Sequence, residues 1–258
     1  MSEIGNEFER TVEIMRKLRS PQGCEWDRQQ THESLKPYII EEAYELVEAI
    51  DERDAEKLKE ELGDVLLQVL FHAHISAEEN EFTITDVLKT LSDKLIRRHP
   101  HVFGNAKGYS YRQWERIKSE EKGKDTHSAI GDLNPALPSL SLARRVQENA
   151  AAVGFDWPSV SGALEKTKEE ISELTEVMDV KEYRKIEEEV GDILFSIVNV
   201  ARFLKVDPEI ALRKATKKFI RRFQQVEKIV SEKNVDLRDL SLEDLDTLWE
   251  EVKGGETK

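Results

Sequence analysis

The sequence predicts an all-α fold made of tandem duplicated helical-bundle modules. Two observations lead to this prediction. Charged residues make up 36% of the chain and aromatic residues 7%, and helix formers dominate nearly every segment. In addition, the stretch 41–64 has a counterpart at 169–192, which indicates that one helical module occurs twice.

Helical patterning covers most of the chain and is marked by capping signals. Ser110 and Ser241 each stand three residues before a Gln or an Asp, as in capping boxes, and Asp207 precedes Pro208 as an N-cap precedes a first-turn proline. Helices are expected near residues 3–19, 34–51, 54–79, 83–98, 110–121, 140–152, 160–178, 181–204, 208–232 and 242–252.

The helices expected at 34–51 and 54–79 each carry one apolar stripe. The short connection DERD at 51–54 predicts that they fold back on each other as an antiparallel hairpin. The stripes consist of Ile39, Ala43, Leu46, Val47 and Ile50 in the first helix and of Leu58, Leu62, Val65, Leu66 and Val69 in the second.

A linker is expected between residues 122 and 138, where KGKDTHSAIGDLNPALP loses its periodicity and gathers glycine and proline. This predicts an N-terminal module at 1–121, the linker at 122–138 and a C-terminal module at 139–258.

The overall charge and composition exclude several classes of partner. A net charge of -14 argues against nucleic-acid polymers and anionic membranes, because both require a positive surface. No apolar run approaches the roughly 18 residues of a membrane span, and the N-terminus lacks the apolar core of a signal peptide. The single cysteine, Cys24, excludes an internal disulfide framework. A cytoplasmic protein is therefore expected.

The repeat preserves more than its acidic residues. EELGDVL and EEVGDIL share five of seven residues, and KLIRR at 94–98 resembles KFIRR at 218–222. The matching carboxylates are Glu41, Glu42, Glu45, Glu61 and Asp64 in the first copy and Glu169, Glu170, Glu173, Glu189 and Asp192 in the second.

Helical geometry predicts that the carboxylates of the first copy converge. Glu42 and Glu45 lie about 80° and 140° to one side of the first stripe, and Glu61 and Asp64 lie about 85° and 145° to the same side of the second. An antiparallel hairpin keeps both flanks on one face, with Glu42 level with Asp64, and Glu45 level with Glu61. Glu41 points further out and is expected to play a supporting role.

Such a cluster predicts a metal site. Neighbouring carboxylates raise one another's pKa unless a cation lies between them, and all-oxygen ligands favour Mg²⁺, with Mn²⁺ as a possible substitute. The predicted ligands are Glu42, Glu45, Glu61 and Asp64, and in the second copy Glu170, Glu173, Glu189 and Asp192. The alternative is a solvated helix face, which explains one copy better than two copies with matched spacing.

Phosphate also requires fixed cations. The candidates are Arg97, Arg98 and Lys118 in the first half and Lys218, Arg221 and Arg222 in the second. Each has an alternative explanation, because basic residues near a helix C-terminus offset the helix dipole.

The segment GCEWDRQQTHESL at 23–35 is interpreted as a loop just before the acidic helix. Trp26 is a candidate for stacking on a base and Asp27 for reading its edge. Alternatively, Trp26 closes the core beneath this segment. The second copy retains only GFDW at 154–157.

Taken in order, these motifs resemble the MazG family of nucleoside triphosphate pyrophosphohydrolases. EExxE, a spacer and ExxD are preceded by GCEWDRQQTHESLKPYIIEEAYE and followed by DKLIRRHPHVFG, and LSLEDLDTLWEEVK stands near the C-terminus. The resemblance covers nearly the whole chain. It implies an all-α NTP pyrophosphohydrolase fold, a homodimer, and cleavage of nucleoside triphosphates between the α and β phosphates.

The resemblance also implies roles for residues. Glu42, Glu45, Glu61 and Asp64 would hold Mg²⁺ with support from Glu41, and Arg97, Arg98 and Lys118 would contact phosphate. A metal-bound water would then attack while a glutamate takes its proton. The second copy lacks the full preceding loop and a clear match to Lys118, so its activity is left open.

Two other classes of protein remain as alternatives. A carboxylate-bridged redox bundle requires Glu-x-x-His pairs, whereas both motifs here have Glu-x-x-Asp. A non-catalytic regulatory protein that binds nucleotide or metal uses the same ligands as an enzyme, and this alternative suits the second module better than the whole chain.

Overall fold

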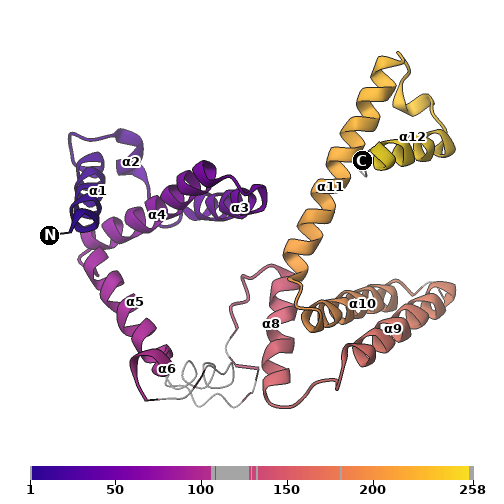
Figure 1. The fold of residues 1–258 in the computed structure, drawn as a ribbon, viewed down its shortest axis with the longest axis horizontal. Coiled ribbons are helices and arrows are strands. Elements are labelled where there is room, and N and C mark those ends of the chain that lie inside the picture. Colours follow the sequence, from indigo (N-terminus) through magenta and orange to yellow (C-terminus); the bar gives the residue numbers. More distant parts are fainter. Residues whose placement is uncertain are drawn as a thin grey trace. The chain divides into compact units, whose positions relative to one another are not determined.

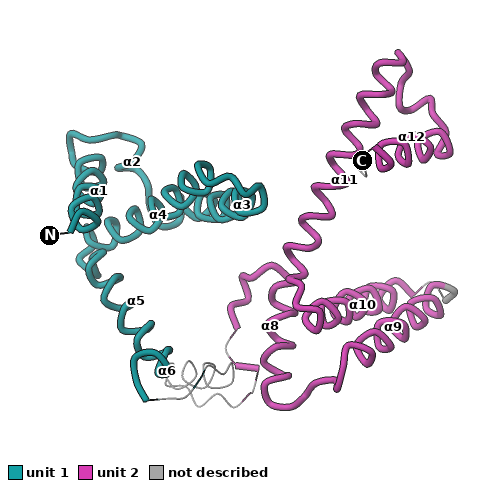
Figure 2. Tube along the Cα trace, viewed as in Figure 1, with its two compact units in different colours: residues 1–110 teal, residues 111–258 magenta. Residues whose placement is uncertain are grey.

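The computed structural model describes residues 2–105, 108, 128, 130–131, 133–180 and 182–255. Within these ranges every regular element is a helix, which confirms the expected all-α class. The chain divides into two compact units, unit 1 at residues 1–110 and unit 2 at residues 111–258 (Figure 2).

Unit 1 is built around its longest helix, α4. Helices α1, α3 and α5 all pack against α4, and α2 packs against α1 (Figure 1). The described helices of this unit are α1 (Glu3–Arg19), α2 (Glu25–Gln29), α3 (Lys36–Glu52), α4 (Ala55–Glu78), α5 (Ile84–Arg98) and α6 (Pro100–Phe103).

The core of unit 1 lies at the C-terminal half of α4. Leu70, Phe71 and Ile75 of α4 are buried together with Met15 of α1 and with Leu35, which directly precedes α3. The N-terminal half of α4 extends beyond this core and pairs with α3, so that the α3–α4 hairpin forms an arm of the unit.

Unit 2 repeats the hairpin and adds a second helix pair. Helices α9 and α10 pack side by side, α8 packs on α10 and α11, and α12 folds back on α11 (Figure 1). The described elements are α8 (Ser139–Ala152), α9 (Val160–Val180), α10 (Tyr183–Phe203), α11 (Pro208–Glu232), the 3₁₀ helix η1 (Leu237–Asp239) and α12 (Leu242–Gly255).

The α11–α12 pair has its own apolar core. Val226 and Val230 of α11 are buried against Leu248 and Val252 of α12, and Trp249 packs at the edge of this cluster. Each unit therefore has a local core of its own, formed by α1 and α4 in unit 1 and by α11 and α12 in unit 2.

The capping signals of unit 2 form as predicted. The Asp207 carboxylate accepts a hydrogen bond from the backbone N–H of Ile210 at 3.0 Å. Ser241 and Asp244 form the expected capping box: the hydroxyl of Ser241 accepts from the Asp244 N–H at 3.2 Å, and the Asp244 carboxylate accepts from the Ser241 N–H at 3.1 Å. The helix expected at 110–121, with Ser110 as its cap, lies outside the described residues.

The interpretation of residues 23–35 as a loop was wrong in part. Residues 25–29 form the one-turn helix α2, which the Arg28 N–H closes by bonding to the carbonyl of Cys24 at 3.1 Å. A single turn shows no hydrophobic periodicity, so the pattern of the sequence does not reveal it. The short helices α6 and η1 were missed for the same reason.

The predicted division at residue 121 and about half of the linker at 122–138 fall on residues outside the described ranges, so this domain organisation stays a prediction. Across the part of the chain that the structure describes, no helix is both long enough and apolar enough to cross a membrane.

Candidate active site

The turn of the α3–α4 hairpin is fixed by two adjacent residues. Arg53 ends α3 in the left-handed conformation, with φ 59° and ψ 31°, and Asp54 begins α4 as its N-cap. The Asp54 carboxylate accepts hydrogen bonds from the N–H groups of Glu56 at 2.9 Å and Lys57 at 3.2 Å. Because one helix stops where the next begins, the two run antiparallel and their acidic flanks face the same side.

The hairpin brings three of the predicted carboxylates of unit 1 together. One oxygen from each of Glu42, Glu45 and Glu61 lies within 4.8 Å of the other two. Glu61 is only 7% exposed, and its Oε2 atom is buried without a hydrogen-bond partner. A buried carboxylate oxygen with no donor nearby is costly, and a cation would satisfy it.

Asp64 and Glu41 lie near this cluster and act on it electrostatically. Burial raises the pKa of Glu42 above its ordinary value, and among the charges around it Asp64 adds most, while Glu41 also contributes. Burial likewise raises the pKa of Glu61, with Glu45 as the strongest charged neighbour. These are the pairs of residues that were predicted to lie at the same height in the hairpin.

Unit 2 contains the matching cluster, with one difference. Oxygens of Glu170, Glu173 and Glu189 lie within 4.8 Å of one another, and Glu170 is only 6% exposed. The ammonium of Lys166 lies 2.9 Å from an oxygen of Glu170 and 2.6 Å from one of Glu169. These hydrogen bonds raise the pKa of Lys166 above its ordinary value, so a fixed positive charge borders this cluster.

Two further features separate the sites. A hydrogen bond with Glu170, and after it burial, raises the pKa of Glu173 above its ordinary value. When 41–64 is matched with 169–192, Tyr38 stands in unit 1 where unit 2 has Lys166. The unit 1 cluster therefore has an uncharged residue at this position, and the favourable charge that acts on Glu61 comes from Lys57, which pairs with Glu52.

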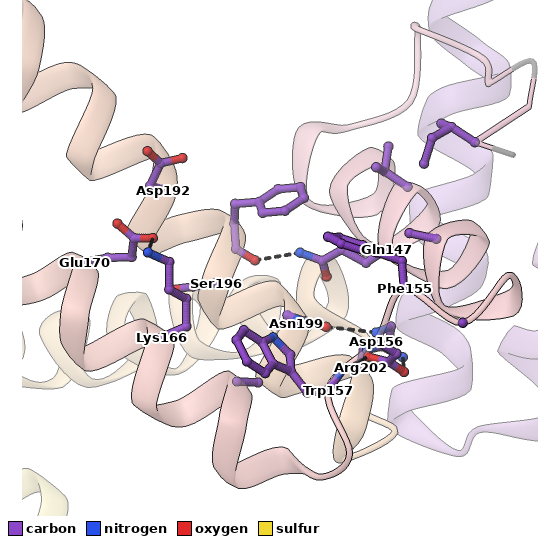
Figure 3. Close-up of a pocket in the computed structure, with 16 residues that line it drawn as sticks. Gln147, Phe155, Asp156, Trp157, Lys166, Glu170, Asp192, Ser196, Asn199 and Arg202 are labelled. Atoms are coloured by element: carbon purple, nitrogen blue, oxygen red, sulfur yellow. Dashed lines mark hydrogen bonds and ion pairs between the residues drawn. The ribbon is translucent and has the colours of Figure 1, made fainter. Parts of the chain in front are cut away.

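A cavity of about 570 Å³ opens beside the cluster of unit 2, between α8, α9 and α10 (Figure 3). Glu170, Lys166 and the exposed Asp192 lie at one end of it, whereas Gln147 and Trp157 lie away from these charges. Its lining is mainly apolar, as expected of a pocket for a ring system with a charged group at one end.

The wall formed by Trp157 depends on a glycine. A Cβ atom placed on Gly162 would lie 2.8 Å from Cε3 of Trp157, so only glycine lets the indole ring lie against the first turn of α9. The adjacent Asp156 forms an ion pair with Arg202 of α10, which ties the segment before α9 to the opposite wall.

The sequence of this chain matches one protein family twice. A family model described as the MazG nucleotide pyrophosphohydrolase domain matches residues 30–103 and 159–227, so that each match contains one acidic hairpin. The chain belongs to the MazG family. This confirms the expected family, the duplicated all-α fold and the enzyme class, which is a hydrolase that releases pyrophosphate from a nucleoside triphosphate and leaves the monophosphate.

Relatives of this MazG chain match it over nearly its full length. A protein of Thermotoga maritima named nucleoside triphosphate pyrophosphohydrolase/pyrophosphatase MazG is 60% identical over 99% of both chains. A nucleoside triphosphate pyrophosphohydrolase of Escherichia coli is 42% identical over 96% of this chain and 97% of its own. YabN of Bacillus subtilis, an uncharacterized protein, is 49% identical over 98% of this chain and 53% of its own length.

The structure places Trp26 and Asp27 on α2, close to the α3–α4 hairpin. The ring of Trp26 is 48% exposed and meets Tyr38 and Phe71 edge-on, with ring centroids 5.8 and 6.2 Å apart. Trp26 therefore packs on the core with one edge, as the alternative interpretation expected, and about half of its surface is exposed, while its contact with a base stays a prediction.

Arg19 holds this segment in place and was missed by the sequence reasoning. Its side chain is 5% exposed, donates to the backbone carbonyls of Asp27 and Gln30, and pairs with Glu78 at the end of α4 at 2.7 Å. The sequence shows only a basic residue in the last turn of a helix, where an arginine commonly offsets the dipole. No local pattern distinguishes this buried arginine from its exposed neighbours.

The predicted phosphate-binding arginines Arg97 and Arg98 lie at the end of α5, on a different helix from the acidic residues. Helix α5 packs on the core through Ile84 at its first residue, and Arg98 follows about 21 Å further along the axis at 1.5 Å per residue. Figure 1 shows α5 leaving the α3–α4 pair rather than lying along it, and Arg97 and Arg98 belong to the last turn of α5. Lys118 lies outside the described residues.

The basic residues of unit 2 have the same placement. Lys218, Arg221 and Arg222 lie on α11, which leaves the α9–α10 pair (Figure 1). The guanidinium of Arg222 lies 5.9 Å from the ring centre of Trp249 on α12. In both units, therefore, one hairpin carries the acidic residues and a diverging helix carries the basic ones.

Proposed function

We propose that the acidic cluster of unit 1 binds Mg²⁺ and forms the catalytic site where this chain hydrolyses nucleoside triphosphates between the α and β phosphates. The proposal rests mainly on the buried Glu61, whose Oε2 has no hydrogen-bond donor and whose neighbours are carboxylates. An all-oxygen ligand set suits Mg²⁺, with Mn²⁺ as a substitute. The names of the Thermotoga maritima and Escherichia coli relatives support a nucleoside triphosphate substrate.

The carboxylates of unit 1 would bind the metal and accept a proton during hydrolysis. Glu42, Glu45, Glu61 and Asp64 would hold the metal, supported by Glu41 from the exposed side of α3. Bound Mg²⁺ supplies Lewis-acid polarisation of the phosphoryl oxygens and lowers the pKa of a bound water. A carboxylate of the cluster takes the proton of the attacking water.

The remaining predicted residues would bind the substrate. Arg97, Arg98 and Lys118 neutralise the pyrophosphate that leaves, because guanidinium and ammonium groups stabilise phosphate charge. Trp26, with about half of its surface open, contacts the base, and Asp27 lies beside it on α2.

Product analysis tests this function. The protein is incubated with ribo- and deoxyribonucleoside triphosphates, with Mg²⁺ or with EDTA, and all products are separated by chromatography. Monophosphate with pyrophosphate, abolished by EDTA, is the expected result. Diphosphate with orthophosphate would show that a different bond is cleaved, and turnover that persists in EDTA would rule out a metal requirement.

Unit 2 is proposed to bind nucleotide through Glu170, Glu173, Glu189 and Asp192 with a metal, in the cavity beside them. One observation favours a second candidate function for this unit, a non-catalytic regulatory site. The ammonium of Lys166 already compensates the charge of Glu170, so a metal has less to gain there than in unit 1.

We also propose that the chain works as a homodimer in the cytoplasm and that each active site takes its arginines from the second copy. In one chain α5 carries Arg97 and Arg98 away from the Glu42–Glu45–Glu61 cluster, whereas the α5 of a second copy is free of this constraint. The net charge of -14 opposes nucleic-acid polymers and anionic membranes as partners.

Complementation tests the shared site. Chains with Glu45→Gln and chains with both Arg97→Ala and Arg98→Ala are each expected to be inactive. After the two are mixed and allowed to exchange subunits, half of the dimers are mixed and each has one intact site, so activity returns to about a quarter of the wild-type value. No recovery in a mixture with proven exchange would place the arginines in the site of their own chain.

A further inference from the structure

Two histidines of unit 1 form a hydrogen bond with each other. Nδ1 of His32 lies 2.6 Å from Nδ1 of His72, and the planes of the two rings differ by 3°. The ring centres are 5.0 Å apart, so the imidazoles meet edge to edge rather than face to face. A bond between two ring nitrogens requires one proton between them, so one Nδ1 atom donates and the other accepts.

The pair joins the two parts of the chain that carry the proposed site. His32 lies in the connection at 30–35, between α2 with Trp26 and α3 with two of the clustered carboxylates, and His72 lies on α4. The other ring nitrogen of His32, Nε2, lies 3.3 Å from the hydroxyl of Ser76, a buried residue of α4. Both nitrogens of His32 therefore bond the connection to α4.

This bond limits how many protons the pair can hold. The two neutral imidazoles carry two protons, one of them between the rings, and a third proton leaves the bond intact. A fourth would put a hydrogen on both Nδ1 atoms and set two N–H groups against each other at 2.6 Å. Separated histidines have no such limit and ionise at about pH 6.5. In acid, separated rings therefore bind one proton that the bonded pair excludes.

The environment of His72 acts in the same direction. Burial, and after it the charge of His32, lowers the pKa of His72 below its ordinary value. A lowered histidine pKa means that the folded state resists protonation. The stability that the pair contributes is therefore present at neutral pH and is lost as the pH falls.

The other titratable groups around the connection have partners of their own. They are Arg16 with Glu13, Arg19 and His74 with Glu78, Arg28 with the carbonyl of Pro21, Glu25 with Gln29, and Glu33 with Lys36. Asp27 of α2 and Tyr38 of α3, on either side of the connection in sequence, are not among the groups that shift the pKa of His72.

We propose that His32 and His72 are positioning residues for the reaction of unit 1, and that their bond holds the connection between α2 and α3 on α4 at neutral pH and releases it in acid. The proposal rests on the proposed catalytic site of unit 1 and on the proposed contact of Trp26 with the substrate. Leu35 stays in the core and Arg19 still bonds the carbonyls of α2, so the segment loosens without unfolding. Substrate affinity then falls with the pH, while the chemical step changes less.

NMR of the full chain labelled with ¹⁵N-histidine counts the protons of the pair without any need for turnover. The signals of the two rings are assigned by their loss in His32→Asn and His72→Asn. Between about pH 7.5 and pH 5.5 the two rings of the wild type should together take up one proton rather than two. Full and independent protonation of both rings over this range would overturn the proposal.

Steady-state kinetics with Mg²⁺ and a nucleoside triphosphate test what the bond does. His72→Phe removes the ring nitrogens, whereas His72→Asn keeps an amide that can donate or accept at any pH. At about pH 7.5 the KM of His72→Phe should be about fivefold above that of the wild type, as expected for one lost hydrogen bond, and His72→Asn should stay near the wild type. At about pH 5 the wild type should approach His72→Phe, while His72→Asn keeps its lower KM. The three kcat values should be alike at each pH.

Substrate and metal titrate alike in all three chains, so the ratios of their KM values report on the pair alone. Ratios that do not change with pH, or a KM of His72→Asn as high as that of His72→Phe, would overturn the positioning role. Failure of the proposed function has a different signature. If none of the chains turns over any nucleoside triphosphate, the catalytic site and the positioning role are both refuted, even where NMR shows the shared proton.

Discussion

Glu61 shows how a single residue connects the fold to metal binding. It lies on the buried side of α4, where Glu42 and Glu45 of α3 face it and no donor reaches its Oε2 atom. Without a cation these carboxylates repel each other, and this repulsion lowers the free energy of unfolding of the metal-free chain. A bound cation would remove this repulsion and stabilise the folded chain.

Substitution of Glu61 by glutamine separates two effects of this carboxylate, which are its repulsion of the neighbouring acids and its binding of the metal. In EDTA, Glu61→Gln should leave the melting temperature unchanged or raise it, because it removes a buried charge from a repulsive cluster. It should also abolish the rise in melting temperature caused by Mg²⁺ and lower turnover about 100-fold. Glu60→Gln, at the exposed neighbouring position, is the matched control and should keep both properties. Normal turnover of Glu61→Gln would refute its role.

The same carboxylates predict how stability depends on pH. Burial and neighbouring acids raise the pKa values of Glu42 and Glu61 above the ordinary 4.5, so the folded state retains protons that the unfolded chain has lost. The free energy of unfolding of the metal-free protein must therefore fall as the pH rises through this window.

Urea unfolding in EDTA at a series of pH values from 4.5 upwards measures this dependence. Other groups titrate too, so the informative quantity is the free energy of unfolding of the wild type minus that of Glu61→Gln, which should decrease as the pH rises. Saturating Mg²⁺ should remove the decrease. A difference that does not change with pH would contradict the raised pKa of Glu61.

At the scale of helices, one buried arginine joins three elements of unit 1. Arg19 ends α1, bonds the carbonyls of Asp27 and Gln30 at the end of α2, and pairs with Glu78 at the end of α4. The five-residue α2 is too short to be stable alone, so this anchor and the contacts of Trp26 determine its position.

Arg19→Leu should therefore destabilise the protein by about 2 kcal/mol and raise KM more than it lowers kcat, because the carbonyls of α2 lose their donor and Trp26 loses its fixed position. Chemical denaturation and steady-state kinetics measure the two effects. Arg16→Leu is the control. Within the described structure Arg16 forms an ion pair with the exposed Glu13, and its substitution should lower the free energy of unfolding by less than about 0.5 kcal/mol. Equal effects of both substitutions would show that Arg19 is not an anchor.

At the scale of the molecule, the α3–α4 hairpin leaves much of its apolar stripes exposed. Ile39 and Ile50 of α3 are 40% and 56% exposed, and Leu62 of α4 is 53% exposed, although the stripes were predicted to pack against each other. The hairpin buries only part of each stripe, so an apolar face remains on α3 and α4. A face of this kind fits the proposed homodimer, because it would be covered by a second copy.

Light scattering after gel filtration should accordingly give twice the 29.8 kDa mass of the chain. Leu62→Asp should shift the mass towards that of one chain and lower activity, since a charge placed in an apolar interface opposes association. Lys59→Asp changes an exposed position on the same helix and should leave the dimer intact. A wild-type chain that runs as a monomer at the concentration of the assay would refute the dimer.

The sequence by itself determined the helical class, the repeat and the convergence of the carboxylates. These properties depend on periodicity and on short-range geometry: the four-residue connection fixes the hairpin, and helical spacing then places Glu42, Glu45 and Glu61 on one face. The family followed from the order of the same motifs and was confirmed by the match of both hairpins.

Only the tertiary structure decided what surrounds these carboxylates. The burial of Arg19 and the unpaired oxygen of Gln147 each arise from contacts between helices that are distant in sequence. The directions of α5 and α11 depend on packing as well, and they separate the basic residues from the acidic hairpins. Periodicity specifies which face of a helix is apolar, but the partner of that face depends on how side chains from the whole chain fit together.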